Sequence, residues 1–233
     1  CSRVEPRYRA VMAGALLLDL DRTLVNVQLF TDYDAAWDDV VALLGERPTD
    51  LGLDTGWTSA TRACMAVLGD LPAGDLWTAV DRAIAVHERA AADRSVTMPG
   101  ATQFVQVMAD RPTAVVTLLP PDVAREVLDH HGLAIDVVVG RDPVVRPKPS
   151  GDGLRRALEI LGEDAATAVM VGDSSWDAAA ALDAGVRFVG VHAPRSEFAE
   201  VHPSAPVCDS LADELLHVVR GPGGRVHLGE LRP

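Results

Sequence analysis

Short apolar runs alternate with amphipathic stretches along most of this chain, and this alternation restricts the possible folds more than any other feature. Apolar runs that are bounded by turn residues are typical of strands buried on both faces of a parallel sheet. The strands that we expect on this basis are 15–18, 114–117, 137–139, 168–171 and 187–191.

The amphipathic stretches between these runs predict helices. Gly185 is expected to end the last of them, because glycine readily takes the left-handed backbone that terminates a helix. Strands that alternate with helices form a doubly wound parallel sheet of the α/β class, in which ligands bind at the carboxyl ends of the strands. The expected helices are 102–109, 122–131, 153–161 and 176–184.

Residues 27–97 break this rhythm, because they contain three amphipathic stretches and no convincing strand. The segment begins after the first strand, so we expect a helical insert in an α/β core. The core would comprise residues 12–26 and 98–220, and the tail 221–233 begins as a linker. The expected helices of the insert are 34–44, 59–68 and 75–92, separated by the turn-rich segments 45–56 and 69–74.

The net charge of −13 argues against nucleic acid or an anionic membrane as a partner. No apolar run is long enough to span a membrane, which takes about 18 residues or more. The three cysteines are scattered and lack the spacing of metal ligands, as is common in a reducing compartment. We therefore expect a cytoplasmic protein, and no pattern in the sequence points to a particular oligomeric state.

Acidic and hydroxyl residues follow three of the expected strands. Asp19 and Asp21 come after the first, Thr117 ends the second, and Asp173 and Asp177 follow the fourth. Carboxylates at i and i+2 on an extended chain point the same way, which is costly unless a cation lies near them. A simpler reading takes each motif alone as an acidic turn, a β-branched strand residue or a helix N-cap. The order of the motifs along the chain favours a shared site.

Lys148 is the only lysine among 21 basic residues, and all the others are arginine. An ammonium is a compact point charge, whereas a guanidinium is a bulky planar fork. The lone lysine therefore predicts a buried anionic site with room for an ammonium and not for a guanidinium. Chance composition is the alternative reading.

The order D-x-D-x-T, T, K-P and G-D-S-x-x-D resembles the haloacid dehalogenase superfamily, in its phosphatase branch with a helical cap. Within that branch the chain is similar to phosphoglycolate phosphatase and β-phosphoglucomutase-like hydrolases, and the resemblance covers nearly the whole chain. Dehalogenases lack the second aspartate, because a departing halide needs no proton. The presence of Asp21 therefore favours phosphoryl transfer over cleavage of a carbon–halogen bond.

The resemblance implies a role for each motif residue. Asp19 would be the nucleophile that forms an aspartyl-phosphate, and Asp21 the general acid and then the base. Thr117 and Lys148 would contact the phosphoryl group and complete the catalytic set. Asp177 would orient a metal-bound water or Lys148. The implied phosphate-binding residues are Leu20, Thr117, Leu118 and Lys148, and the implied Mg²⁺ ligands are Asp19, Asp21 (through its backbone carbonyl) and Asp173.

We therefore expect a Mg²⁺-dependent phosphatase that acts on a small phosphorylated metabolite. A phosphomutase of the β-phosphoglucomutase kind is an alternative, and a non-catalytic phosphate-binding module on the same fold is a further one. Arg22 and Asn26 stand where relatives of the phosphoglycolate phosphatase type commonly have glycine and aspartate. Both departures weaken the transfer of a substrate from that subgroup.

Overall fold

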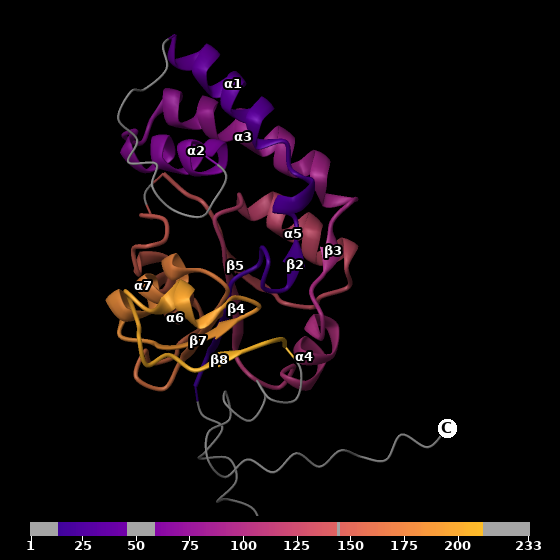
Figure 1. The fold of residues 1–233 in the computed structure, drawn as a ribbon, viewed down its shortest axis with the longest axis vertical. Coiled ribbons are helices and arrows are strands. Elements are labelled where there is room, and N and C mark those ends of the chain that lie inside the picture. The colour runs from indigo at the N-terminus through magenta and orange to yellow at the C-terminus, as the bar shows by residue number, and fades with distance from the viewer. Residues whose placement is uncertain (1–13, 46–58, 144, 212–233) are drawn as a thin grey trace, which may run out of the picture.

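The computed structural model describes residues 14–45, 59–143 and 145–211 (Figure 1). The predicted start of the core at residue 12, its end at residue 220 and the tail 221–233 lie outside the described residues. Most of the predicted turn-rich segment 45–56 lies outside them as well.

A six-stranded parallel sheet forms the centre of the core, in the order β5-β4-β1-β6-β7-β8. Its middle strand β1 pairs with β4 and β6, so these three strands end side by side. The five predicted strands are all present to within one residue at each end, and β8 adds a sixth. The bounds are β1 Leu16–Leu18, β4 Thr113–Val116, β5 Val137–Val139, β6 Val169–Gly172, β7 Arg187–Val191 and β8 Val207–Cys208.

Helices cover both faces of this sheet, which confirms the predicted doubly wound α/β fold. Along β1, Leu16 and Leu18 point to one face and Leu17 to the other, as the two-residue period of a strand requires. The first face packs against α4 and α5, and the second against α6 and α7. The bounds are α4 Ala101–Val107, α5 Pro121–His130, α6 Asp152–Leu161 and α7 Ser175–Ala184.

Three further helices form a separate layer above the sheet in Figure 1, which we call the helical layer. It consists of α1 Tyr33–Leu44, α2 Ser59–Asp70 and α3 Asp75–Ala92, which share one apolar cluster. Leu118, after β4, and Trp176, at the start of α7, pack against this cluster from the core. The layer therefore lies over the carboxyl ends of the central strands.

The chain enters and leaves the helical layer through two short antiparallel strands, β2 (Val25–Asn26) and β3 (Val96–Thr97). The prediction of no strand within residues 27–97 is therefore wrong for β3. Both residues of β3 are exposed, and two residues are too few to show a strand pattern in sequence. Two 3₁₀ turns, at Gln28–Phe30 and Arg195–Phe198, were also not predicted. Among the described residues, no helix is both long and apolar enough to cross a membrane.

Candidate active site

The predicted site residues meet at the carboxyl ends of β1, β4 and β6. Asp19 follows β1 and its backbone N–H donates to Val171 of β6, while Thr117 follows β4 and donates to Val139 of β5. Asp173 follows β6. These backbone hydrogen bonds and the pairing of β6 with β1 place the three residues at one edge of the sheet, where they line a cavity of about 40 Å³.

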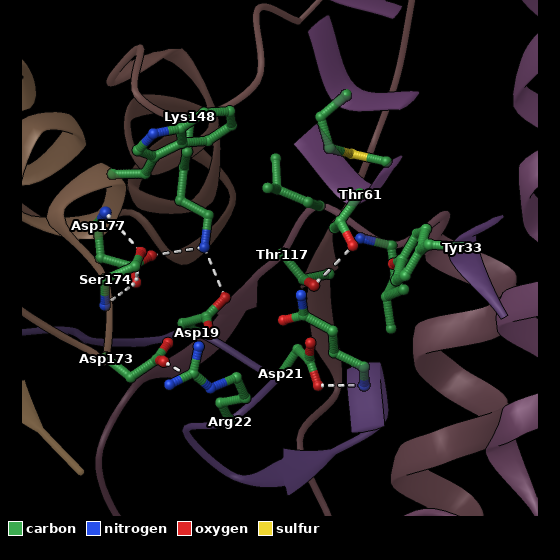
Figure 2. Close-up of a pocket in the computed structure, with 15 residues that line it drawn as sticks. Asp19, Asp21, Arg22, Tyr33, Thr61, Thr117, Lys148, Asp173, Ser174 and Asp177 are labelled. Carbon is green, nitrogen blue, oxygen red and sulfur yellow. Dashed lines mark hydrogen bonds and ion pairs between the residues drawn. The ribbon is translucent and has the colours of Figure 1, made fainter. Parts of the chain in front are cut away.

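The cavity brings together most of the residues that the motifs predicted (Figure 2). The predicted residues that line it are Asp19, Asp21, Thr117, Leu118, Lys148, Asp173 and Asp177. Leu20 is the exception, because its side chain is fully buried in the apolar core. Any contact of Leu20 with a phosphate would have to come from its backbone.

Lys148 lies between two carboxylates at the centre of the site (Figure 2). Its Nζ is 2.5 Å from Asp19 Oδ1 and 2.6 Å from Asp177 Oδ1, and all three side chains are buried. Burial alone would lower the pKa of Lys148, but the charges of Asp177 and Asp19 outweigh it and raise the pKa above its ordinary value. The ammonium therefore stays charged throughout the physiological range.

Asp177 is held by the start of α7. Its Oδ2 accepts hydrogen bonds from the backbone N–H of Ser174, at 3.1 Å, and from the Ser174 hydroxyl, at 2.6 Å. Together with the bond from Asp177 N to Ser174, these contacts form a capping box. Both oxygens of Asp177 are thus engaged, one by Lys148 and one by the helix cap.

Asp19, Asp173 and Asp177 form a buried acidic cluster, with one oxygen of each within 4.8 Å of the others. Burial raises the pKa of Asp19 to about 7; Lys148 opposes this shift and Asp177 adds to it. Burial and the charge of Asp19 likewise raise the pKa of Asp173. The carboxylates of Asp19 and Asp173 repel each other when both are ionised, and a hard divalent cation between them would relieve this repulsion. Carboxylate oxygens are donors that such a cation prefers.

Asp21 lines the same cavity as Asp19 but is not one of the three carboxylates of this cluster. Its Oδ1 accepts hydrogen bonds from the backbone N–H groups of Val27, at 2.7 Å, and Gln28, at 2.9 Å. Burial raises the pKa of Asp21 to about 6, and the two amide hydrogen bonds limit the rise. A carboxyl with this pKa can both give and take a proton near neutral pH.

Arg22 adds a cation that the motif does not require. Its Nε lies 3.2 Å from Asp173 Oδ2, while about half of its side chain is exposed. Its backbone is left-handed, with φ of 60°, a conformation that glycine adopts without strain and that is uncommon for other residues. The left-handed backbone explains why glycine was the residue expected at this position.

The helical layer supplies cavity residues that the sequence did not reveal. Tyr33 of α1 and Thr61 and Met65 of α2 line the cavity opposite the core residues. Figure 2 shows Tyr33 and Thr61 on the Thr117 side of the site, away from Asp177. Nothing local in the sequence marks these residues, because they reach the site only through the packing of the layer on the core.

The sequence profile of the haloacid dehalogenase-like hydrolases matches residues 13–185 of the chain, which includes all the motif residues. The chain therefore belongs to this family of hydrolases.

Its relatives place it among the phosphatases of the family. It is 31% identical over 182 residues to a plasmid-borne phosphoglycolate phosphatase of Cupriavidus necator, covering 74% of this chain and 78% of that protein. A phosphoglycolate phosphatase of Neisseria meningitidis is 45% identical over 82 residues, which span 34% of this chain and only 35% of that protein. Among solved structures, CbbY of Rhodobacter sphaeroides in complex with xylulose-(1,5)bisphosphate has a TM-score of 0.62 at 24% identity. That alignment covers 87% of this chain and 96% of CbbY, and it supports the fold.

Proposed function

We propose that this protein is a Mg²⁺-dependent phosphatase that hydrolyses a small phosphorylated metabolite through an aspartyl-phosphate intermediate on Asp19. The observation that carries the proposal is the buried ammonium of Lys148 between Asp19 and Asp177. An ammonium at this place offsets the charge of the nucleophile and of an incoming phosphoryl group, which would otherwise repel each other.

In the first half of the reaction, an Asp19 oxygen attacks phosphorus, and the bond from phosphorus to the ester oxygen breaks. Asp21 gives its proton to that oxygen, so that a neutral alcohol leaves. Thr117 and Lys148 donate hydrogen bonds to the phosphoryl oxygens. In the second half, Asp21 takes a proton from water as the water oxygen attacks phosphorus, which releases phosphate and restores Asp19.

The carboxylates of Asp19 and Asp173 and the backbone carbonyl of Asp21 would hold Mg²⁺, since these are hard oxygen donors. The bound ion would offset negative charge on the phosphoryl group and lower the cost of keeping Asp19 ionised. Asp177 would act by orienting Lys148, because both of its oxygens are already engaged.

We further propose that residues 27–97 act as a cap on the α/β core and contribute to substrate choice. Tyr33, Thr61 and Met65 support this role because they line the cavity from the helical layer. A cap that closes over the substrate would exclude water from the reacting phosphoryl group. Phosphoglycolate, the substrate in the names of several relatives, is the first candidate to test.

The proposal predicts hydrolysis of an activated aryl phosphate that requires added Mg²⁺ and stops in excess chelator. Release of inorganic phosphate is the measurement, and readdition of Mg²⁺ is the control for irreversible damage. Full turnover in excess chelator would contradict the metal assignment, and no turnover with Mg²⁺ would favour a non-catalytic phosphate-binding module.

A panel of phosphoglycolate, sugar phosphates and nucleotides then tests the substrate class. We expect the small phosphates to give the highest kcat/KM. Conversion of a sugar phosphate to its positional isomer, without net release of phosphate, would instead identify a phosphomutase.

A further inference from the structure

A buried arginine connects the helical layer to the core beside the active site. Arg141 follows β5, and only 2% of its side chain is exposed. Its Nε is 2.7 Å from Asp81 Oδ1, and its Nη1 and Nη2 are 3.0 and 2.9 Å from the two oxygens of Glu88. Asp81 and Glu88 both belong to α3. The guanidinium therefore binds α3 through a bidentate ion pair with Glu88 and a second ion pair with Asp81.

The same arginine also holds the loop that follows β4. Its Nη1 donates to the backbone carbonyl of Leu118 at 2.9 Å, and its backbone N–H donates to Leu119 at 2.9 Å. Within that loop, the N–H of Leu119 donates to the Thr117 hydroxyl at 3.2 Å. Residues 117–119, which we call the phosphate loop because Thr117 and Leu118 line the cavity, are thus fixed by Arg141 at two carbonyls.

Glu88 carries the connection back to the cavity. Its Oε1 accepts a hydrogen bond from the Tyr33 hydroxyl at 3.1 Å, and Tyr33 of α1 lines the cavity. A continuous set of contacts therefore runs from the phosphate loop through Arg141 and Glu88 to Tyr33. It joins the two sides of the site, one supplied by the core and the other by the helical layer.

General stability is a poor explanation for this arrangement. Taking charges out of water costs several kcal/mol per ion, so buried ion pairs commonly add little net stability over apolar residues of the same volume. Burial lowers the pKa of Arg141, but the charges of Glu88 and Asp81 outweigh this effect and raise it. The group is therefore a permanent cation whose geometry, a planar fork with fixed donor directions, sets where α3 and the phosphate loop lie relative to each other.

We propose that Arg141 is a positioning residue that couples the seating of the helical layer to the geometry of the phosphate loop. The proposal rests on the proposed phosphatase function and deepens it. When α3 is seated, Asp81 and Glu88 hold the guanidinium where it fixes the Leu118 carbonyl, and the Thr117 hydroxyl then faces the phosphoryl group. Cutting the connection leaves Asp19, Asp21 and Lys148 in place but misplaces Thr117, the donor that the phosphate loop supplies to the phosphoryl group.

Three variants test this coupling, and each cuts it differently. Arg141→Lys keeps the charge but loses the fork. Arg141→Met combined with Glu88→Gln removes both buried charges, so that neither is left unpaired. Asp81→Asn weakens only the outer contact, at a residue that does not line the cavity. The matched control is Arg89→Gln, because Arg89 joins α3 to Glu126 and Asp122 of α5 through exposed ion pairs that do not touch the phosphate loop.

The readouts are kcat and KM, inhibition by inorganic phosphate with Mg²⁺ present, melting temperature, and amide hydrogen exchange of peptides that contain residues 117–119. For Arg141→Lys and the double variant we expect kcat to fall at least about 10-fold and phosphate to bind at least about 10-fold more weakly. Exchange at the phosphate loop should become faster. Asp81→Asn should show the same changes at about 3-fold, and Arg89→Gln should change none of them by more than about 2-fold.

The proposal is overturned if a folded double variant or Asp81→Asn keeps wild-type phosphate affinity and wild-type exchange at residues 117–119. It is also overturned if Arg89→Gln, at an equal loss of melting temperature, reproduces the changes, since the effect would then reflect stability alone. If the wild-type protein hydrolyses no phosphate ester, the proposed function fails. The exchange of residues 117–119 would still decide whether Arg141 couples the two parts.

Discussion

An ammonium held between two buried carboxylates leaves little space for a larger cation. Lys148 Nζ contacts Asp19 and Asp177 at 2.5 and 2.6 Å, and all three side chains are buried. The alternative, that the lone lysine is an accident of composition, predicts an exposed side chain with no fixed partner. The buried contacts favour a specific role, and substitution can measure it.

Replacing Lys148 by arginine should reduce turnover at least about 100-fold, a loss of about 3 kcal/mol in transition-state stabilisation. The guanidinium keeps the charge, but its planar fork cannot occupy the position of an ammonium between Asp19 and Asp177. The measurement is kcat with an aryl phosphate, with circular dichroism and Mg²⁺ titration as controls for folding and metal binding. Near-normal activity would show that charge alone matters at this position.

Replacing Asp21 by asparagine should affect substrates according to their leaving groups. An alkyl phosphate needs a proton on its departing oxygen, so its kcat/KM should fall at least about 100-fold. An activated aryl phosphate, whose phenolate departs without a proton, should lose much less in its first step. Pre-steady-state release of the phenol separates that step from hydrolysis of the intermediate. Equal losses in this step for both substrates would exclude Asp21 as the general acid.

At the scale of elements, the last residue of β6 determines how closely α7 approaches the sheet. A Cβ placed on Gly172 would come 2.5 Å from Cγ of Asp177, which is closer than two non-bonded carbon atoms can approach. Only glycine therefore lets the capping box of α7 and the contact with Lys148 form together.

Gly172→Ala should displace Asp177 from Lys148 and lower kcat at least about 10-fold, with a stability loss of about 1–3 kcal/mol from overpacking. The measurements are kcat and denaturant unfolding. Gly69→Ala in α2 is the matched control, because no atom lies within 4 Å of the added carbon. That variant should be as stable as the wild type or slightly more so, since alanine favours a helix. Unchanged activity in Gly172→Ala would mean that the position of Asp177 is not critical.

An element could be predicted from the sequence when the residues that determine it lie within the element itself. The predicted helix ends lie within two residues of the observed ends, because apolar periodicity and a terminating glycine such as Gly185 are local signals. The motif residues Asp19, Thr117 and Asp173 could be grouped because parallel strands end at one edge of the sheet. In contrast, β3 and β8 form only through pairing with distant segments.

The Arg141 connection was missed for a related reason, although one sign of it was present in the sequence. Val80, Ile84 and Glu88 follow one another at four-residue intervals on the buried side of α3. A glutamate on an apolar stripe needs a buried partner, because an unpaired charge there is too costly. Its partner lies 53 residues away, however, and only the folded structure identifies it as Arg141.

At the scale of the whole molecule, the acidic site should make folding stability depend on pH when no metal is present. Asp19 and Asp21 have pKa values of about 7 and 6 in the folded protein, against 3.8 for an ordinary aspartate. Between about pH 4 and 7 these two carboxyls thus bind more protons in the folded state than in the unfolded state. Their contribution to stability is therefore present at low pH and lost as the pH rises through this window.

In excess chelator, Asp19→Asn should consequently be more stable than the wild type at pH 8, and the two should converge near pH 4.5. We expect a difference of a few kcal/mol at pH 8, and added Mg²⁺ should reduce it by stabilising the wild type. Comparing the two proteins cancels the opposite effect of His131 and His192, whose pKa values are lowered by burial. The measurement is denaturant unfolding at both pH values, and a wild type that is the more stable protein at pH 8 without metal would contradict the prediction.

The antiparallel pairing of β2 with β3 also bears on how such a protein can change over evolutionary time. Asn26 pairs with Val96 and Val25 with Thr97. The two points where the intervening segment leaves and rejoins the α/β core are therefore adjacent. Neighbouring positions in an antiparallel pair are only about 5 Å apart, a gap that a tight turn can bridge. Segments of very different length could therefore be exchanged between these two points without moving the catalytic strands. New substrates could then be acquired by replacing one contiguous stretch of the gene while the chemistry is inherited unchanged.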